Sequence, residues 1–155
     1  MLIKTKFNVP LLRSKILDRA HLLKKLSEGK SDRIISITGQ AGAGKTLLVS
    51  QWAIYYNLST AWYSLDETDN DSDLFYRYLL TTIGNKNNKL AEGFGPFLQS
   101  RQKLFAKDVL PCVIEYLDDL TEDLYLILDD YHLITSDEIH EALSYLFNRQ
   151  HRLSN

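Results

Sequence analysis

One stretch of eight residues constrains this 155-residue chain more than any other feature. Gly39-Gln40-Ala41-Gly42-Ala43-Gly44-Lys45-Thr46 follows the pattern G-x-x-x-x-G-K-[ST], in which glycines let the backbone curl until successive N–H groups face one anion. A helix that begins at the lysine adds its positive N-terminal end at the same place. The stretch therefore predicts a phosphate-binding loop, in which Lys45 contacts the β- and γ-phosphates of a nucleotide and the Thr46 hydroxyl ligates Mg²⁺.

Three short apolar segments predict buried strands: 33–38, which leads into the loop, 60–65 and 124–128. They are apolar throughout rather than alternating, which is typical of parallel strands covered by helices. Helical patterns separate them along the chain, and strands that alternate with helices indicate the α/β class. We therefore expect a three-layer, P-loop NTPase-type parallel sheet with helices on both faces.

Apolar residues at three- and four-residue spacing predict a helix after the loop and three more helices later in the chain. Asp71 or Ser72 is expected to cap the helix that contains Phe75. Pro111 lies inside the longest apolar stripe, so that helix should begin near this proline or bend there. The stretch 84–100 is rich in Asn and Gly and contains a proline, and it is expected to be a long surface loop.

Composition excludes several classes of function. Hydrophobic residues make up 45% and charged residues 25% of the chain, which are ordinary values for a globular domain. The net charge of -2 provides no basic surface for neutralising DNA phosphates, and the apolar runs are much shorter than the ~20 residues of a membrane helix. The single cysteine cannot form an internal disulfide. We expect a cytoplasmic domain that binds neither nucleic acid nor membrane.

A second acidic site is expected directly after the third apolar segment, where Asp129 and Asp130 stand. A P-loop core needs a carboxylate at the end of a neighbouring strand to hold Mg²⁺, and we assign this role to Asp129, acting through a water because Mg²⁺ dehydrates reluctantly. Asp130 is the candidate for orienting or deprotonating an attacking water. The alternative is that both acids only cap a turn. Asp66 ends the second strand at the same edge and could touch Mg²⁺ or water.

Asp69, Asp71 and Asp73 alternate as in a calcium loop. Leu74 and Leu80 occupy the positions where such a loop needs glycine and glutamate, so capping and turn roles are expected for these acids instead.

Several motifs together resemble the N-terminal nucleotide-binding domain of the MalT-like large ATP-dependent transcriptional activators, which are STAND-class P-loop NTPases. The resemblance extends over essentially the whole chain. It rests on Lys6-Phe7 with Pro10, Arg13, Arg19 and Leu22-Leu23, on the loop followed by Gln51-Trp52, on Trp62–Glu67 with Asp69-Asn70, and on the string L-D-D-Y-H-L-I at 128–134. The usual phosphate-loop sequence of the family is A-P-A-G-[FY]-G-K-T, whereas this chain has Gly39-Gln40 and Ala43.

The resemblance implies a switch that holds ADP at rest, exchanges it for ATP when a distant sensor binds an inducer, and then self-associates. It implies that Arg19 and the backbone near Val9-Pro10 lie beside the adenine or ribose. Residues 1–30 would then form an adenine-side segment and residues 31–155 a partial P-loop core. In this fold class the next strand lies between the loop strand and the Asp129 strand. We expect a fragment truncated before that strand and before any DNA-binding helix-turn-helix, weakly stable alone or completed by a partner.

Three functions stay open from the residues alone. The first is an ATP/ADP-dependent switch with slow or no hydrolysis, using Mg²⁺, and therefore at most a slow ATPase. The second is an autonomous P-loop ATPase or small-molecule kinase, although Arg149 and Arg152, the late candidates for lid arginines, read more simply as charges at a helix end. The third is an interaction module with a vestigial loop, which the intact Lys45, Thr46 and Asp129 argue against.

Overall fold

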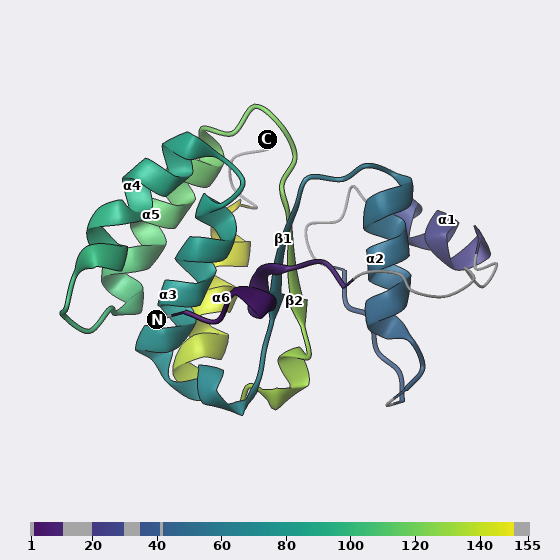
Figure 1. Ribbon diagram of the computed structural model, residues 1–155, viewed down its shortest axis with the longest axis horizontal. Helices are drawn as coiled ribbons and strands as arrows, with labels where there is room; N and C mark the ends of the chain where they lie inside the picture. Colours follow the sequence, from purple (N-terminus) through teal and green to yellow (C-terminus); the bar gives the residue numbers. More distant parts are fainter. Residues whose placement is uncertain (1, 11–19, 30–34, 41, 151–155) are drawn as a thin grey trace. The chain divides into compact units, whose positions relative to one another are not determined.

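The computed structural model describes residues 2–10, 20–29, 35–40 and 42–150, and the chain divides into two compact units (Figure 1). Unit 1 comprises residues 1–8 and 60–155, and unit 2 comprises residues 9–59. The elements in chain order are the 3-10 helix η1 (Lys4–Phe7), α1 (Ala20–Glu28), α2 (Lys45–Tyr55), β1 (Thr60–Ser64), the 3-10 helix η3 (Glu67–Asn70), α3 (Ser72–Gly84), α4 (Asn88–Gln99), α5 (Ala106–Asp118), β2 (Tyr125–Asp129), the 3-10 helix η4 (Tyr131–Leu133) and α6 (Asp137–Gln150).

The sheet of unit 1 consists of β1 and β2, which pair in parallel with Thr60 opposite Tyr125 and Ser64 opposite Asp129. Both strands were expected from their apolar runs, and both are confirmed within one residue. Trp62 in β1 is 1% exposed, and the neighbouring Tyr63 is fully buried in the core of unit 1. A parallel pair joined through helices confirms the α/β class.

Helices α3 to α6 gather on one side of the strand pair in Figure 1. Of these helices, α3 contacts β1 and also each of α4, α5 and α6, so it occupies the centre of the layer. Its N-cap is Asp71, whose carboxylate accepts a hydrogen bond from the Leu74 amide at 3.0 Å, as expected from the sequence. The helices around it bury a continuous core that includes Phe75, Leu79, Phe94, Val109 and Ile139.

The prediction of a surface loop over residues 84–100 is wrong, because most of this stretch forms α4. Asn87 caps the helix through the Lys89 amide, and the side chains of Leu90 and Phe94 are buried against the core. Gly93 lets the helix approach α5 closely, since a Cβ there would lie 2.1 Å from Cζ of Tyr116. Burial of this apolar face outweighs the weak helix propensity of the glycines and the proline in the stretch.

The expectation of a strand before the phosphate loop also differs from the structure. Residues 35–38 have no regular secondary structure, and residues 33–34 lie outside the described residues. A strand must satisfy its backbone groups on a neighbour, and in the described part of the chain β1 and β2 pair only with each other.

The expected helix that contains Pro111 is confirmed as α5. It begins at Ala106 with the proline inside it, so of the two expected alternatives the start near the proline does not hold, and a bend there stays a prediction. The missing N–H of the proline removes one rung of the hydrogen-bond ladder, and burial of Val109 and Val113 on either side helps to hold the helix.

Unit 2 contains α1 and α2, which pack against each other. Leu26, Leu48 and Trp52 are buried, and the indole Nε1 of Trp52 donates a hydrogen bond to Oγ of Ser27 at 3.1 Å. Helix α2 is confirmed, and it begins at Lys45 as expected. Within the described residues of both units, no helix is both long enough and apolar enough to cross a membrane.

Candidate functional site

The phosphate loop lies in unit 2, where it leads directly into α2. Gly42 and Gly44 have φ angles of +77° and +72°, in the left-handed region that favours glycine over other residues. A side chain at Gly42 would meet no atom within 4 Å, so this glycine is needed for its backbone conformation and not for space. The amide of Ala43 donates to the Gln40 carbonyl at 3.2 Å, which closes the turn.

Helix α2 presents its N-terminal end to the loop. It begins at Lys45 with Gly44 as N-cap, and its first backbone hydrogen bond runs from the Leu48 amide to the Gly44 carbonyl at 3.0 Å. The N–H groups of a helix's first turn have no acceptor inside the helix, and together with the helix dipole they favour a bound anion. Trp52 and Ala53, further along the helix, are buried.

The Lys45 side chain folds back along its own loop. Its Nζ donates to the carbonyl oxygens of Gly39 and Gln40, at 3.0 and 3.1 Å. The ammonium therefore lies over the loop backbone at the start of α2. Thr46, the next residue, is half-buried in the first turn of α2.

An acidic edge lies in unit 1, where β1 and β2 end side by side. Asp129 is the last residue of β2, is half-buried, and accepts a hydrogen bond at its backbone carbonyl from the Leu65 amide at 3.0 Å. Asp130 follows in the left-handed conformation, with φ +58°, which is uncommon for a residue with a side chain but least so for Asp and Asn. Its carboxylate is half-exposed and lies 3.9 Å from Nδ1 of His132.

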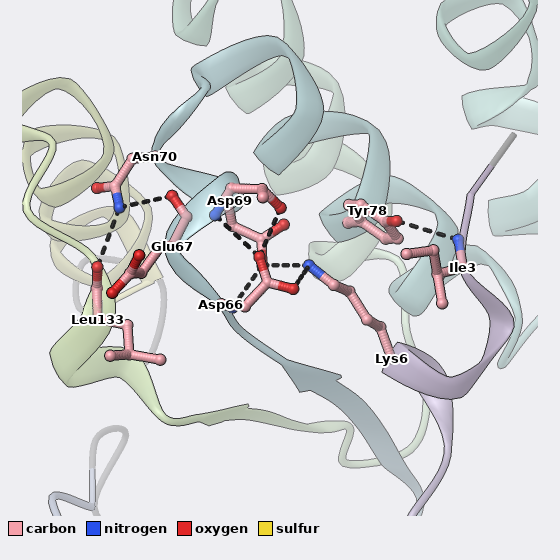
Figure 2. Close-up of polar contacts among 9 residues, drawn as sticks. Ile3, Lys6, Asp66, Glu67, Asp69, Asn70, Tyr78 and Leu133 are labelled. Atoms are coloured by element: carbon pink, nitrogen blue, oxygen red, sulfur yellow. Dashed lines mark hydrogen bonds and ion pairs between the residues drawn. The ribbon is translucent and has the colours of Figure 1, made fainter.

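The end of β1 leads into η3, whose N-terminus forms a capping box (Figure 2). The Asp66 carboxylate accepts from the Thr68 amide at 2.9 Å, and Oδ2 of Asp69 accepts from the Asp66 amide at 2.8 Å. Nζ of Lys6, from η1, lies 2.8 Å from Oδ2 of Asp66 and 2.6 Å from Oδ2 of Asp69. The hydrogen bond from Lys6 holds the pKa of Asp66 below its usual range, and Thr68 adds to this. Asp66 is thus engaged with Lys6 and Thr68 in the structure.

Asn70, at the end of η3, joins this turn to the segment that follows β2. Its Nδ2 donates to the carbonyls of Glu67 and Leu133, at 3.1 and 3.0 Å (Figure 2). Its Oδ1 accepts from the amides of Thr135 and Ser136, at 2.7 and 3.0 Å. The D-N pair and the D-D-Y-H-L-I string, separate motifs in the sequence, therefore meet in unit 1.

Of the residues expected at the site, the described ones lie in two places. Gly39, Gln40, Gly42, Ala43, Gly44, Lys45 and Thr46 lie together in the loop and first turn of unit 2, and Asp129 and Asp130 lie at the acidic edge of unit 1. Ala41 and Arg19 lie outside the described residues. The pairing of Lys45 with Asp129 around one nucleotide stays a prediction.

The interactions of Lys6, Asp69 and Asn70 were missed by reasoning from motifs and spacing. Asp69 was expected only to cap a turn, which it does, and Lys6 and Asn70 entered only as motif letters. A signal was present, since the polar stretch D-E-T-D-N directly follows a buried strand at the expected ligand edge of an α/β sheet. No pattern in the neighbouring sequence indicated that Lys6, 63 positions away, would be the partner of Asp69.

Comparison with known proteins agrees with these features. The family model described as an AAA domain matches residues 27–154, which include the phosphate loop, the acidic edge and helices α2 to α6. The chain belongs to the AAA domain family. Because AAA domains are P-loop nucleotide-binding domains, membership implies nucleotide binding.

Two curated relatives of this AAA domain carry the same name, HTH-type transcriptional regulator MalT. They come from Klebsiella pneumoniae subsp. pneumoniae and from Klebsiella pneumoniae strain 342. Each is 36% identical to the chain over 150 residues, which is 97% of this chain and 16% of the relative. The resemblance to MalT-like proteins is confirmed, and the chain spans only about a sixth of their length.

Proposed function

We propose that this chain is the ATP/ADP-binding switch module of a signal-responsive transcriptional activator, and that it hydrolyses ATP slowly or not at all. The observation that carries the proposal is the loop geometry within an AAA domain. Two left-handed glycines precede the N-terminus of α2, and the Lys45 ammonium is held on the loop's own carbonyls. The 36% identity to relatives named as transcriptional regulators supports the regulatory part.

The loop suits the phosphates of a nucleotide in charge and in shape. Charge-assisted hydrogen bonds to phosphate oxygens are stronger than those to neutral carbonyls. Lys45 would therefore exchange its bonds to Gly39 and Gln40 for bonds to the β- and γ-phosphates. The backbone N–H groups of residues 39–46 would surround the same phosphates, as is usual for a loop of this pattern.

The metal ligands are proposed from their chemistry. Mg²⁺ prefers hard oxygen donors, and the chain supplies the Thr46 hydroxyl and the Asp129 carboxylate at the positions where P-loop proteins use them. Asp130 would orient or deprotonate the attacking water if hydrolysis takes place. Arg19 and the backbone at Val9-Pro10 would contact the adenine or ribose. Mg²⁺ itself would neutralise charge that develops on the phosphates.

The partners follow from the same proposal. The module would bind an adenine nucleotide and would self-associate in the ATP state, while any binding of DNA would belong to another region of the full protein. It would act in the cytoplasm, where a bacterial regulator of transcription works.

The test is a titration of the purified chain with fluorescent ADP and ATP, with and without Mg²⁺, followed by a turnover measurement. Tight binding with turnover below about one per minute is expected, against the roughly 1–100 s⁻¹ of kinases. Lys45→Ala should abolish most of the triphosphate affinity, whereas Lys25→Ala, an exposed lysine of α1, should bind like the parent.

Asp129→Asn should weaken the Mg²⁺-dependent part of binding more than the Mg²⁺-free part. Binding of ATP by Lys45→Ala at the parental affinity would show that the phosphate contact is wrong. Equal losses with and without Mg²⁺ would remove the role given to Asp129. Turnover in the range of kinases would favour an autonomous enzyme over a switch.

A further inference from the structure

The N-terminal arm, residues 2–8, is anchored on unit 1 by a lysine that is almost fully buried (Figure 2). The Lys6 side chain is 8% exposed, and its Nζ contacts both the fully buried Asp69 and the half-exposed Asp66. Nζ also lies 4.7 Å from the centre of the Tyr78 ring. Two further contacts hold the arm, a hydrogen bond from the Ile3 amide to the Tyr78 hydroxyl at 3.0 Å and the packing of Phe7 on the same ring.

This ion cluster is not explained by stability alone. Lysine is rarely buried, and a buried ion pair is often no more stabilising than apolar residues of similar size. Oδ1 of Asp69 and the hydroxyl of Tyr63 are buried, and neither has a hydrogen-bond partner among the described residues. Burial raises the pKa of Tyr63, and the charge of the Asp69 carboxylate raises it further. The cluster therefore depends strongly on the charge that Lys6 brings to it.

The arm is also one of the two covalent connections to unit 2. Asn8 is the last residue of unit 1 before the chain enters unit 2 at Val9, and the chain returns at Thr60, the first residue of β1. The 3-10 helix η1 lies against β1, so both connections start from the same part of unit 1. The phosphate loop lies between these two connections in the sequence.

We propose that Lys6 is a positioning residue, whose ion pairs with Asp66 and Asp69 hold the N-terminal arm on unit 1 and thereby strengthen nucleotide binding by unit 2. The nucleotide part rests on the function proposed above. A segment tethered at both ends has less conformational freedom than one tethered at a single end, and a site that is already ordered binds its ligand more tightly. Coupling between two sites is reciprocal, so bound nucleotide must in turn strengthen the docking of the arm.

The test compares Lys6→Met with Lys4→Met in the otherwise unchanged chain. Methionine keeps an apolar stem of similar length but removes the charge, and Lys4 is an exposed lysine in the same 3-10 helix. Hydrogen exchange of the backbone amides of residues 2–8 reports docking of the arm, and the dissociation rate of fluorescent ADP reports the site in unit 2.

In Lys6→Met, the hydrogen-exchange rate of the arm amides should rise ~10-fold or more, because the change removes one partner of a buried ion pair. It should release ADP about fivefold faster or more, within the usual range of coupling between sites. Saturating ADP should slow the exchange of the arm in the parent but not in Lys6→Met. Lys4→Met should match the parent in all three measurements.

Parental arm exchange in Lys6→Met would overturn the anchor. A released arm with an unchanged ADP dissociation rate, or an arm in the parent that does not respond to ADP, would overturn the coupling. If the parent itself binds no ADP, the proposed function and the coupling fail together, while the arm exchange still decides the anchor. If Lys6→Met does not fold, Asp66→Asn replaces it, because the Asp66 side chain is 48% exposed and an amide there weakens one of the two ion pairs.

Discussion

Removing the side chain of Asn70 should destabilise unit 1 by about 2–3 kcal/mol. The amide group makes four hydrogen bonds to backbone groups, of which those to the Leu133 carbonyl and the Ser136 amide are partly buried and those to Glu67 and Thr135 are exposed. Each partly buried group left unpaired costs about 1 kcal/mol, and the exposed ones cost less because water replaces the lost bond. The loss is large beside a total stability of roughly 5–15 kcal/mol.

The measurement is urea unfolding of Asn70→Ala followed by tryptophan fluorescence. The chain has two tryptophans, Trp52 in unit 2 and Trp62 in β1, so a Trp52→Phe background makes the signal report unit 1 alone. The midpoint should fall by roughly 1 M, given a slope of about 1–3 kcal/mol per M, while the slope stays unchanged.

Two further variants test this interpretation, one that keeps the acceptor oxygen of the side chain and one that serves as a surface control. Asn70→Asp keeps an acceptor for Thr135 and Ser136 and places negative charge near the N-terminus of α6, so it should retain at least half of the stability that Asn70→Ala loses. Asn148→Ala, at an exposed position of α6, should unfold like the parent. A midpoint for Asn70→Ala within about 0.5 kcal/mol of the parent would refute the view that this side chain joins η3 to the segment after β2.

Two further predictions concern the loop and the acidic edge. Gly44→Ala should weaken nucleotide binding and lower the melting temperature of unit 2, because a side chain at φ +72° costs roughly 1–2 kcal/mol of backbone strain. An unchanged affinity and melting curve would contradict the left-handed conformation of this turn. Since Lys6 holds the pKa of Asp66 below its usual value, the stability from this pair is present above the unfolded pKa of about 3.9 and is lost as pH falls through the lower folded pKa. The stability difference between the parent and Asp66→Asn should therefore be constant from about pH 5 to 8 and should shrink in stronger acid; a difference that does not depend on pH would show that the charge of Asp66 plays no part.

Much of this chain could be predicted from local pattern. The phosphate loop was recognisable because its chemistry needs particular residues at fixed spacing, and Gly42 and Gly44 adopt the conformations for which glycine is required. Strands β1 and β2 and helices α2, α3 and α6 followed from apolar periodicity and caps, which act over a few neighbouring residues.

The remaining features depend on contacts between parts of the chain that are far apart in the sequence. Helix α4 forms despite its glycines and proline because the side chains of Leu90 and Phe94 are buried in the core. Residues 35–38 have the composition of a strand but pair with no neighbouring strand among the described residues. The contacts of Lys6 with Asp69 and of Asn70 with Leu133 each join residues 63 positions apart. Periodicity and propensity act within a few residues, whereas such pairs form only when distant segments of the chain come together. For this physical reason the phosphate loop could be predicted from the sequence, and the contacts of Lys6 and Asn70 could not.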